Sequence, residues 1–106
     1  MVTFEDFKRL DIRIGRVIAA AKVEGTDKLL RLEVDLGEKK QQLVAGIAEY
    51  YRPDEVLNKE LPVLVNLESR KIKGVESQGM ILAISGENKI NLLHPDKEVA
   101  PGSRVS

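Results

Sequence analysis

The sequence predicts an all-β protein, a five-stranded barrel with short helices and terminal extensions. Three observations lead to this fold class. Apolar and polar residues alternate along several short segments, as they do in strands with one buried face. The segment Ile12–Val23 is long and β-branched, and its alternation breaks at Gly15 and Arg16. A short helical stretch within Ala48–Leu57 separates three strands from two more, which is the arrangement of an OB-fold.

The N-terminal part predicts a short helix followed by one long, bent strand. Thr3–Arg9 begins with a capping-box pattern, and Phe4 and Phe7 are expected to face the core from this helix. In Ile12–Val23, the glycine at the break in alternation predicts a bulge or bend at Gly15. A bend of this kind would let one strand serve two sheets, as a small closed barrel requires.

The rest of the chain alternates between strands and turns. Further strands are expected, in chain order, at Leu30–Leu36, Gln41–Ile47, Leu61–Leu67, Gly79–Ser85 and Lys89–Leu93, the last two joined by a turn at residues 86–88. Pro53 should interrupt the helical piece in Ala48–Leu57, and Pro62 suits the start of a strand or an edge. Glu68–Gln78 is expected to be a polar loop, and the proline-containing tail after Leu93 to be irregular.

Length and composition limit the possible functions. The 106 residues predict a single domain, 1–106. The 17 Lys and Arg residues balance the 17 Asp and Glu residues, which argues against binding nucleic acid by bulk charge. The lack of cysteine excludes disulfides and thiolate metal sites and fits a cytoplasmic location. No apolar run approaches the roughly 20 residues of a membrane span, so no membrane partner is expected.

The residues that usually carry catalysis do not form a recognisable site. His94 is the only histidine, and it is interpreted as a surface or packing residue. Ser77 misses the G-x-S-x-G pattern of hydrolases by one position, and Met80 stands where a P-loop has lysine. Carboxylates are scattered, with no pair suited to acid–base chemistry. The chain is therefore predicted not to be an enzyme and to have no metal, catalytic residue or cofactor.

The segment Glu68–Gln78 is the best candidate for a binding site. Its basic residues, which could donate to phosphate groups, are Arg70, Lys71 and Lys73. Ser77 and Gln78 could bond to ribose hydroxyls, while Gly74 and Gly79 allow close approach of a backbone. A solvated hairpin loop is the plain alternative, but OB-folds commonly bind oligonucleotides between their last barrel strands. Aromatic residues are few, which favours a folded RNA over splayed single strands.

Several motifs follow one another over nearly the whole chain. They are Phe7–Val17, Thr26–Leu30, Val44–Ile47, Asn66-Leu67 and Arg70–Met80. Together they resemble the tRNA-binding domain family, which is found at the end of archaeal-type methionyl-tRNA synthetases. Thr26 stands where the family usually has alanine, Leu30 where it has tyrosine, and Ala45 where it has serine. These departures put any RNA contact at Leu30 or Ala45 in doubt.

The resemblance implies an OB-fold that binds the tRNA elbow without sequence specificity and forms a homodimer through its terminal extensions. It also implies a methionyl-tRNA synthetase catalytic body as partner. Carried over residue by residue, the RNA-contacting candidates are Lys28, Asn66, Arg70, Lys71, Lys73, Ser77, Gln78 and Met80. Asn66 could equally orient the loop, and Met80 could equally belong to the core.

Two other interpretations remain open. One is a protein-binding homodimer like the bacterial secretion chaperone that shares this fold. An apolar groove in place of the basic loop would favour it, and Arg70–Lys73 argues against it. The other is a dimerisation module whose RNA surface has decayed, which the zero net charge permits. The sequence does not distinguish an excised domain from a separate polypeptide.

Overall fold

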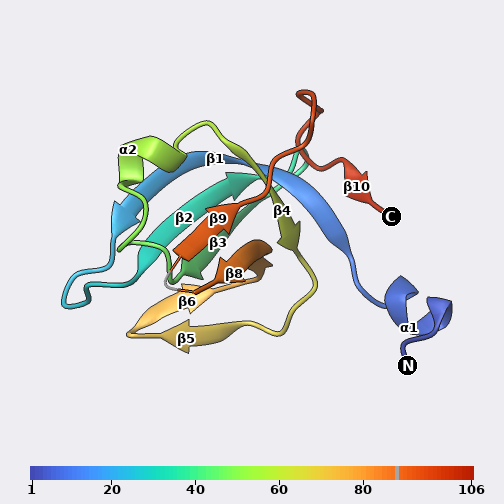
Figure 1. Cartoon of the computed structure of the whole chain (residues 1–106), viewed down its shortest axis with the longest axis horizontal. Coiled ribbons are helices and arrows are strands. Elements are labelled where there is room, and N and C mark those ends of the chain that lie inside the picture. Colours follow the sequence, from blue (N-terminus) through green and yellow to red (C-terminus); the bar gives the residue numbers. More distant parts are fainter. Residues whose placement is uncertain (88) are drawn as a thin grey trace.

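The computed structural model, which describes residues 1–87 and 89–106, contains a nearly closed antiparallel barrel (Figure 1). Its five strands are β1 (Ile12–Lys22), β2 (Leu30–Asp35), β3 (Lys40–Ala45), β4 (Glu60–Leu64) and β7 (Met80–Ile81). They lie side by side in the order β3-β2-β1-β4-β7. This architecture confirms the predicted all-β, OB-like barrel.

Shorter elements surround the barrel (Figure 1). They are α1 (Phe4–Lys8), α2 (Pro53–Val56), β5 (Arg70–Ile72), β6 (Val75–Ser77), β8 (Ala83–Gly86), β9 (Lys89–Leu92) and β10 (Arg104–Val105). Strands β5 and β6 form one hairpin and β8 and β9 another. Residue 88, in the turn predicted at 86–88, lies outside the described part of the chain. Neither helix found in residues 1–87 and 89–106 has the length and apolar character needed to cross a membrane.

Strand β1 holds the barrel together because it pairs with three other strands. Residues 12–16 pair with β4, residues 16–22 pair with β2, and residues 12–13 pair with β10. The pairing with β2 shifts register between Val17 and Ala19, so the bulge predicted at Gly15 lies further along the strand. Gly15 has a packing role instead: an added Cβ would lie 3.1 Å from the Cβ of Val34.

The core is the inner surface of the barrel. Strand β2 confirms the predicted alternation, since Leu30, Leu32 and Val34 are fully buried between exposed Arg31 and Glu33. The other fully buried side chains of the described chain are Val17, Leu43, Val56, Leu61 and Val63. Burial of this apolar surface is the main force that stabilises the fold.

The N-terminal helix is formed as predicted but does not join the core. The hydroxyl of Thr3 accepts the Asp6 N–H, and the Asp6 carboxylate accepts the Thr3 N–H, both at 3.1 Å. However, Phe4 is 71% exposed and Phe7 is 37% exposed, so the prediction that they face the core is wrong. The helix has only five residues, and Figure 1 shows it projecting beyond the end of β1, away from the barrel.

Two prolines occupy positions that differ from the predictions. Pro53 begins α2 instead of interrupting it, because a first-turn residue needs no N–H partner. Pro62 lies in the middle of β4, where its carbonyl accepts the N–H of Leu82 at 3.0 Å. The N–H that proline lacks would point to that same edge of the strand, so the pairing of β4 with β1 loses no hydrogen bond.

The C-terminal tail is irregular over residues 93–103, as expected, but hydrogen bonds to the barrel hold it, and it ends in β10. The N–H of Gly102 donates to the carbonyl of Ile14 at 2.7 Å, and the N–H of Ile14 donates to Ser103 at 2.8 Å. Ile14 thus continues the pairing between β1 and β10. The isolated sequence gives no sign of this, because Ile14 and Gly102 are far apart along the chain.

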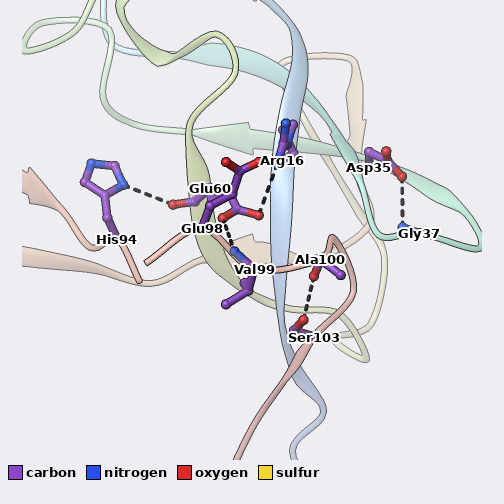
Figure 2. Close-up of polar contacts among 9 residues, drawn as sticks. All are labelled: Arg16, Asp35, Gly37, Glu60, His94, Glu98, Val99, Ala100 and Ser103. Carbon is purple, nitrogen blue, oxygen red and sulfur yellow. Dashed lines mark hydrogen bonds and ion pairs between the residues drawn. The ribbon is translucent and has the colours of Figure 1, made fainter. Parts of the chain in front are cut away.

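A polar cluster fixes the tail just before β10 (Figure 2). Arg16 bonds to Glu98 at 2.7 Å, while the buried carboxylate of Glu60 accepts the N–H of Val99 at 2.9 Å. His94 donates through Nδ1 to the backbone carbonyl of Glu60 at 3.0 Å. The hydrogen bond to Glu98 and the charges of Glu98 and Glu60 raise the pKa of Arg16.

Candidate nucleic-acid interface

The segment expected to be a polar loop is mainly a β-hairpin. Arg70 pairs with Ser77, Lys71 with Glu76, and Ile72 with Val75. The turn consists of Lys73 and Gly74, both with positive φ, at 52° and 81°. Such a two-residue turn matches the natural twist of paired strands. The hairpin therefore holds its basic residues in fixed positions.

The hairpin separates basic side chains that the sequence places together. Side chains alternate between the two faces of a strand, so Arg70 and Ile72 share one face and Lys71 lies on the other. Ser77, on the face of Arg70, is only 3% exposed, which identifies this face as the one turned toward the barrel. Lys71 lies on the outward face, opposite Glu76. The three predicted basic residues thus point in different directions.

Lys73 has an unusual backbone conformation for its residue type. The left-handed region suits glycine and asparagine, and a lysine there costs about 1 kcal/mol. Strain of this kind persists only where the surrounding structure fixes it, and it is common at functional sites. At the tip of the hairpin, the exposed Lys73 extends away from the barrel core.

Lys73 and Lys28 meet at a surface cleft with a volume of about 370 Å³. The cleft lies between the hairpin tip and the turn that leads from β1 to β2. It is lined by Gly25, Thr26, Asp27, Lys28, Leu29, Ile72 and Lys73. The fold therefore unites two predicted RNA-contacting residues that are distant in sequence. Leu29 and Ile72, which were not singled out from the sequence, give this cleft its apolar walls.

Ser77 and Gln78 close the barrel. The Ser77 hydroxyl accepts the N–H of Val44 at 3.0 Å and donates to the carbonyl of Gly79 at 3.0 Å. The Gln78 side chain accepts the N–H of Gln42 at 2.8 Å. Both side chains satisfy backbone groups along β3, where the barrel lacks a regular ladder to its neighbour. This structural role was not evident from sequence, where both residues were proposed as ribose contacts.

Asn66 and Met80 lie away from the cleft. The Asn66 side chain accepts the N–H of Asp11 at 3.0 Å and donates to the carbonyl of Arg9 at 2.8 Å. It thus fixes the link between α1 and β1. Met80 is 41% exposed, which decides between its two predicted locations in favour of the surface.

Part of the remaining basic charge is neutralised by neighbours. Arg13 bonds to Asp11 at 2.9 Å, and Arg16 to Glu98. Arg31 instead lines a small cleft beside Val75 of the hairpin, together with Lys22. Four basic residues, Lys22, Lys28, Arg31 and Lys73, therefore line clefts beside the hairpin, although the whole chain has no net charge.

Comparisons with known proteins identify relatives of this chain. The tRNA binding domain family matches residues 12–104. The methionine–tRNA ligase of Thermotoga maritima is 49% identical over 105 residues, which cover 99% of this chain and 17% of that ligase. The chain thus spans about one-sixth of the length of this relative.

Solved structures with the same fold include two different kinds of protein. A protein from Pyrococcus horikoshii related to methionyl-tRNA synthetase superimposes with a TM-score of 0.95 at 36% identity, covering 100% of this chain and 98% of that one. The chaperone CsaA from Bacillus anthracis str. Ames gives 0.92 at 32% identity, covering 100% and 99%. Fold similarity alone therefore does not separate RNA binding from chaperone activity.

Proposed function

Because this chain belongs to the tRNA binding domain family, we propose that it is a non-catalytic module that binds the elbow of tRNA without sequence specificity. The observation that carries the proposal is the convergence of Lys28 and Lys73 on one cleft beside the hairpin. Lysine ammonium groups bind phosphates as point charges, and phosphate contacts position a protein on RNA without reading its sequence.

The small number of exposed aromatic rings indicates which form of RNA the surface can bind. Proteins that bind single strands rely on exposed aromatic rings. Tyr51 is not available for this purpose, since its hydroxyl bonds to Ile90 and Leu92 of β9. Tyr50 is 41% exposed but does not line the cleft. Phe4 and Phe7 lie on α1, which precedes β1, whereas the cleft is lined by the turn that follows β1. Figure 1 shows α1 and this turn at opposite ends of β1. A folded RNA recognised by its shape and backbone fits this surface better.

The module would increase the tRNA affinity of a methionyl-tRNA synthetase in the cytoplasm, as its C-terminal domain or as a separate subunit. This step is supported by the 49% identity to a methionine–tRNA ligase. A second binding site linked to a catalytic body raises the effective concentration of the same tRNA. It leaves the chemistry of aminoacylation to that body.

A homodimer is the second part of the proposal. No residue of α1 is buried within the chain, and Phe4, Phe7 and Leu10 together leave an apolar surface uncovered. Helix α1 nevertheless has a complete capping box, so it is a formed helix none of whose residues is buried within residues 1–87 and 89–106. A second copy would cover it through a two-fold interface, the commonest symmetry of homo-oligomers.

A tRNA gel shift at low and moderate salt, with a polyanion competitor, tests the RNA proposal. Several elongator tRNAs should bind with similar affinity, and mini-helices without an elbow should bind less well. A marked preference for methionine tRNA would contradict recognition by shape alone. Suppression of aggregation of an unfolded protein, without any tRNA shift, would instead favour the chaperone-like alternative.

A further inference from the structure

The cleft between Lys28 and Lys73 has a composition that phosphate binding alone does not explain. Leu29 and Ile72 are half-buried and form apolar walls, and the exposed residues Lys28 and Lys73 also line the cleft. A phosphate needs only the charges. A ligand that also uses the walls combines an apolar group with negative charge.

The size of the cleft limits what can enter. Its volume of about 370 Å³ lies near the lower end of the range for small-molecule sites, roughly 300–1,000 Å³. That volume suits one small ring system. Within RNA, a single base that is not stacked in a helix, together with its two neighbouring phosphates, has this shape and charge.

The polar groups of the cleft fit a base better than an aliphatic side chain. Asp27 is exposed at the cleft and offers carboxylate oxygens to the amino group of a base. Bases removed from a stack are commonly held between apolar side chains, as Leu29 and Ile72 would hold one here. The absence of an aromatic ring from this cleft predicts a weaker contact than a stacking platform gives.

The walls belong to elements that are already fixed. The carbonyl of Leu29 accepts the N–H of Val23 at 3.1 Å, and the hydroxyl of Thr26 donates to Val23 at 2.9 Å. Ile72 is paired with Val75 next to the strained turn at Lys73. Because both sides are held by hydrogen bonds, little conformational entropy is lost when a base enters.

We propose that this cleft receives one unstacked base of the bound RNA, while Lys28 and Lys73 hold its flanking phosphates. The inference rests on the proposed tRNA binding and adds a subsite to it. Leu29 and Ile72 contact the base, so they contribute affinity that does not depend on salt. Lys28 and Lys73 contribute the salt-dependent part.

The test compares substitutions inside and outside the cleft. Ile72→Ala should weaken tRNA binding about five- to tenfold, with the salt slope unchanged because no phosphate contact is lost. Ile84→Ala is the matched control: Ile84 is 51% exposed on β8, away from the cleft, and its loss should leave affinity unchanged. Ile72→Thr keeps a β-branched residue in β5 and should weaken binding similarly if the hairpin remains folded.

A tRNA set with single abasic positions in the unpaired elbow nucleotides identifies the base. One of these tRNAs should bind the wild-type protein about five- to tenfold more weakly than the intact tRNA does. With that abasic tRNA, Ile72→Ala should cause no further loss of affinity. The base subsite would be overturned if every abasic tRNA bound equally well, or if the losses from the abasic position and from Ile72→Ala were additive. Displacement of tRNA by an unfolded polypeptide would also overturn it. If tRNA does not bind at all, the proposed function itself fails.

Discussion

Gln42 and Gln78 are joined by two hydrogen bonds of 2.8 Å. The backbone N–H of Gln78 donates to the carbonyl of Gln42, and the side chain of Gln78 accepts the N–H of Gln42. Next to them, Ser77 accepts the N–H of Val44. These contacts replace the missing ladder between the two ends of the sheet. Side-chain hydrogen bonds, together with the backbone bond from Gln78 to Gln42, therefore close the barrel in place of a regular ladder.

Ser77→Ala should destabilise the protein. It leaves the buried N–H of Val44 without a partner, which costs about 1–3 kcal/mol. Urea unfolding measures the change. Ser85→Ala, on exposed β8, is the control and should change the free energy of unfolding by no more than about 0.5 kcal/mol. An unchanged unfolding midpoint for Ser77→Ala would show that closure of the barrel does not depend on this hydroxyl.

Lys73→Asn should separate stability from RNA binding. Asparagine tolerates the positive φ of 52° found at this position, so the free energy of unfolding should rise by about 0.5–1 kcal/mol. Loss of the ammonium group should weaken tRNA binding and reduce the salt slope by about one unit. Thermal unfolding measures the change in stability, and a salt titration measures the affinity for tRNA and the salt slope. Tighter tRNA binding by the variant would exclude Lys73 as a phosphate contact.

Lys71→Ala should have a smaller effect on tRNA binding than Lys73→Asn. Lys71 lies on the hairpin face opposite Ile72, which lines the cleft, and its cross-strand neighbour is the acidic Glu76. The salt slope for Lys71→Ala should therefore change by less than about half a unit. The same salt titration compares the two. If Lys71→Ala causes the larger loss, the RNA lies against the outward face.

Replacing Phe4 and Phe7 together by serine should separate the proposed dimer. Wild-type protein at micromolar concentration should sediment at about twice the chain mass of 11.8 kDa, and the variant at the single-chain mass. Because α1 buries no residue in its own barrel, the fold of the monomer should persist. A wild-type protein that sediments as a monomer at every concentration would contradict the proposed interface.

Removing the module from a fused methionyl-tRNA synthetase should raise the KM for tRNA and leave kcat nearly unchanged. A module that binds the tRNA equally tightly in the ground state and in the transition state contributes only to binding. The KM values for ATP and methionine should not move. Steady-state aminoacylation with and without residues 1–106 measures the effect. A collapse of kcat with KM intact would indicate that the module shapes the active site.

Local patterns predicted the elements whose environment is simple. Leu30, Leu32 and Val34 alternate with polar residues because β2 has one buried face, and Thr3 and Asp6 show the helix cap directly. The β5–β6 hairpin was harder to predict, since its strands have three residues each and Lys73-Gly74 is not a preferred hairpin turn. Short strands leave too few residues to establish a period.

The candidate site was predicted only in part from the sequence. Lys28 and Lys73 were selected by family resemblance, but their meeting depends on tertiary packing that no spacing reveals. The hydrogen bond between Ser77 and Val44 is also a tertiary contact. Gly79 gave a usable signal, because an added Cβ would lie 2.6 Å from the Leu64 carbonyl. The sequence indicated that Gly79 allows close approach of a backbone, and here that backbone belongs to the protein itself.

The pairing of Ile12 with Val105 has a consequence for synthesis of the chain. On the ribosome, β1 emerges early, but the backbone groups of Ile14 that face the tail have no partner until Gly102 and Ser103 have been made. During that interval the nascent chain has an open strand edge next to apolar residues, which favours association with other unfinished chains. Pairing with the tail removes this edge, so the nascent domain becomes protected only after Gly102 and Ser103 have emerged from the ribosome.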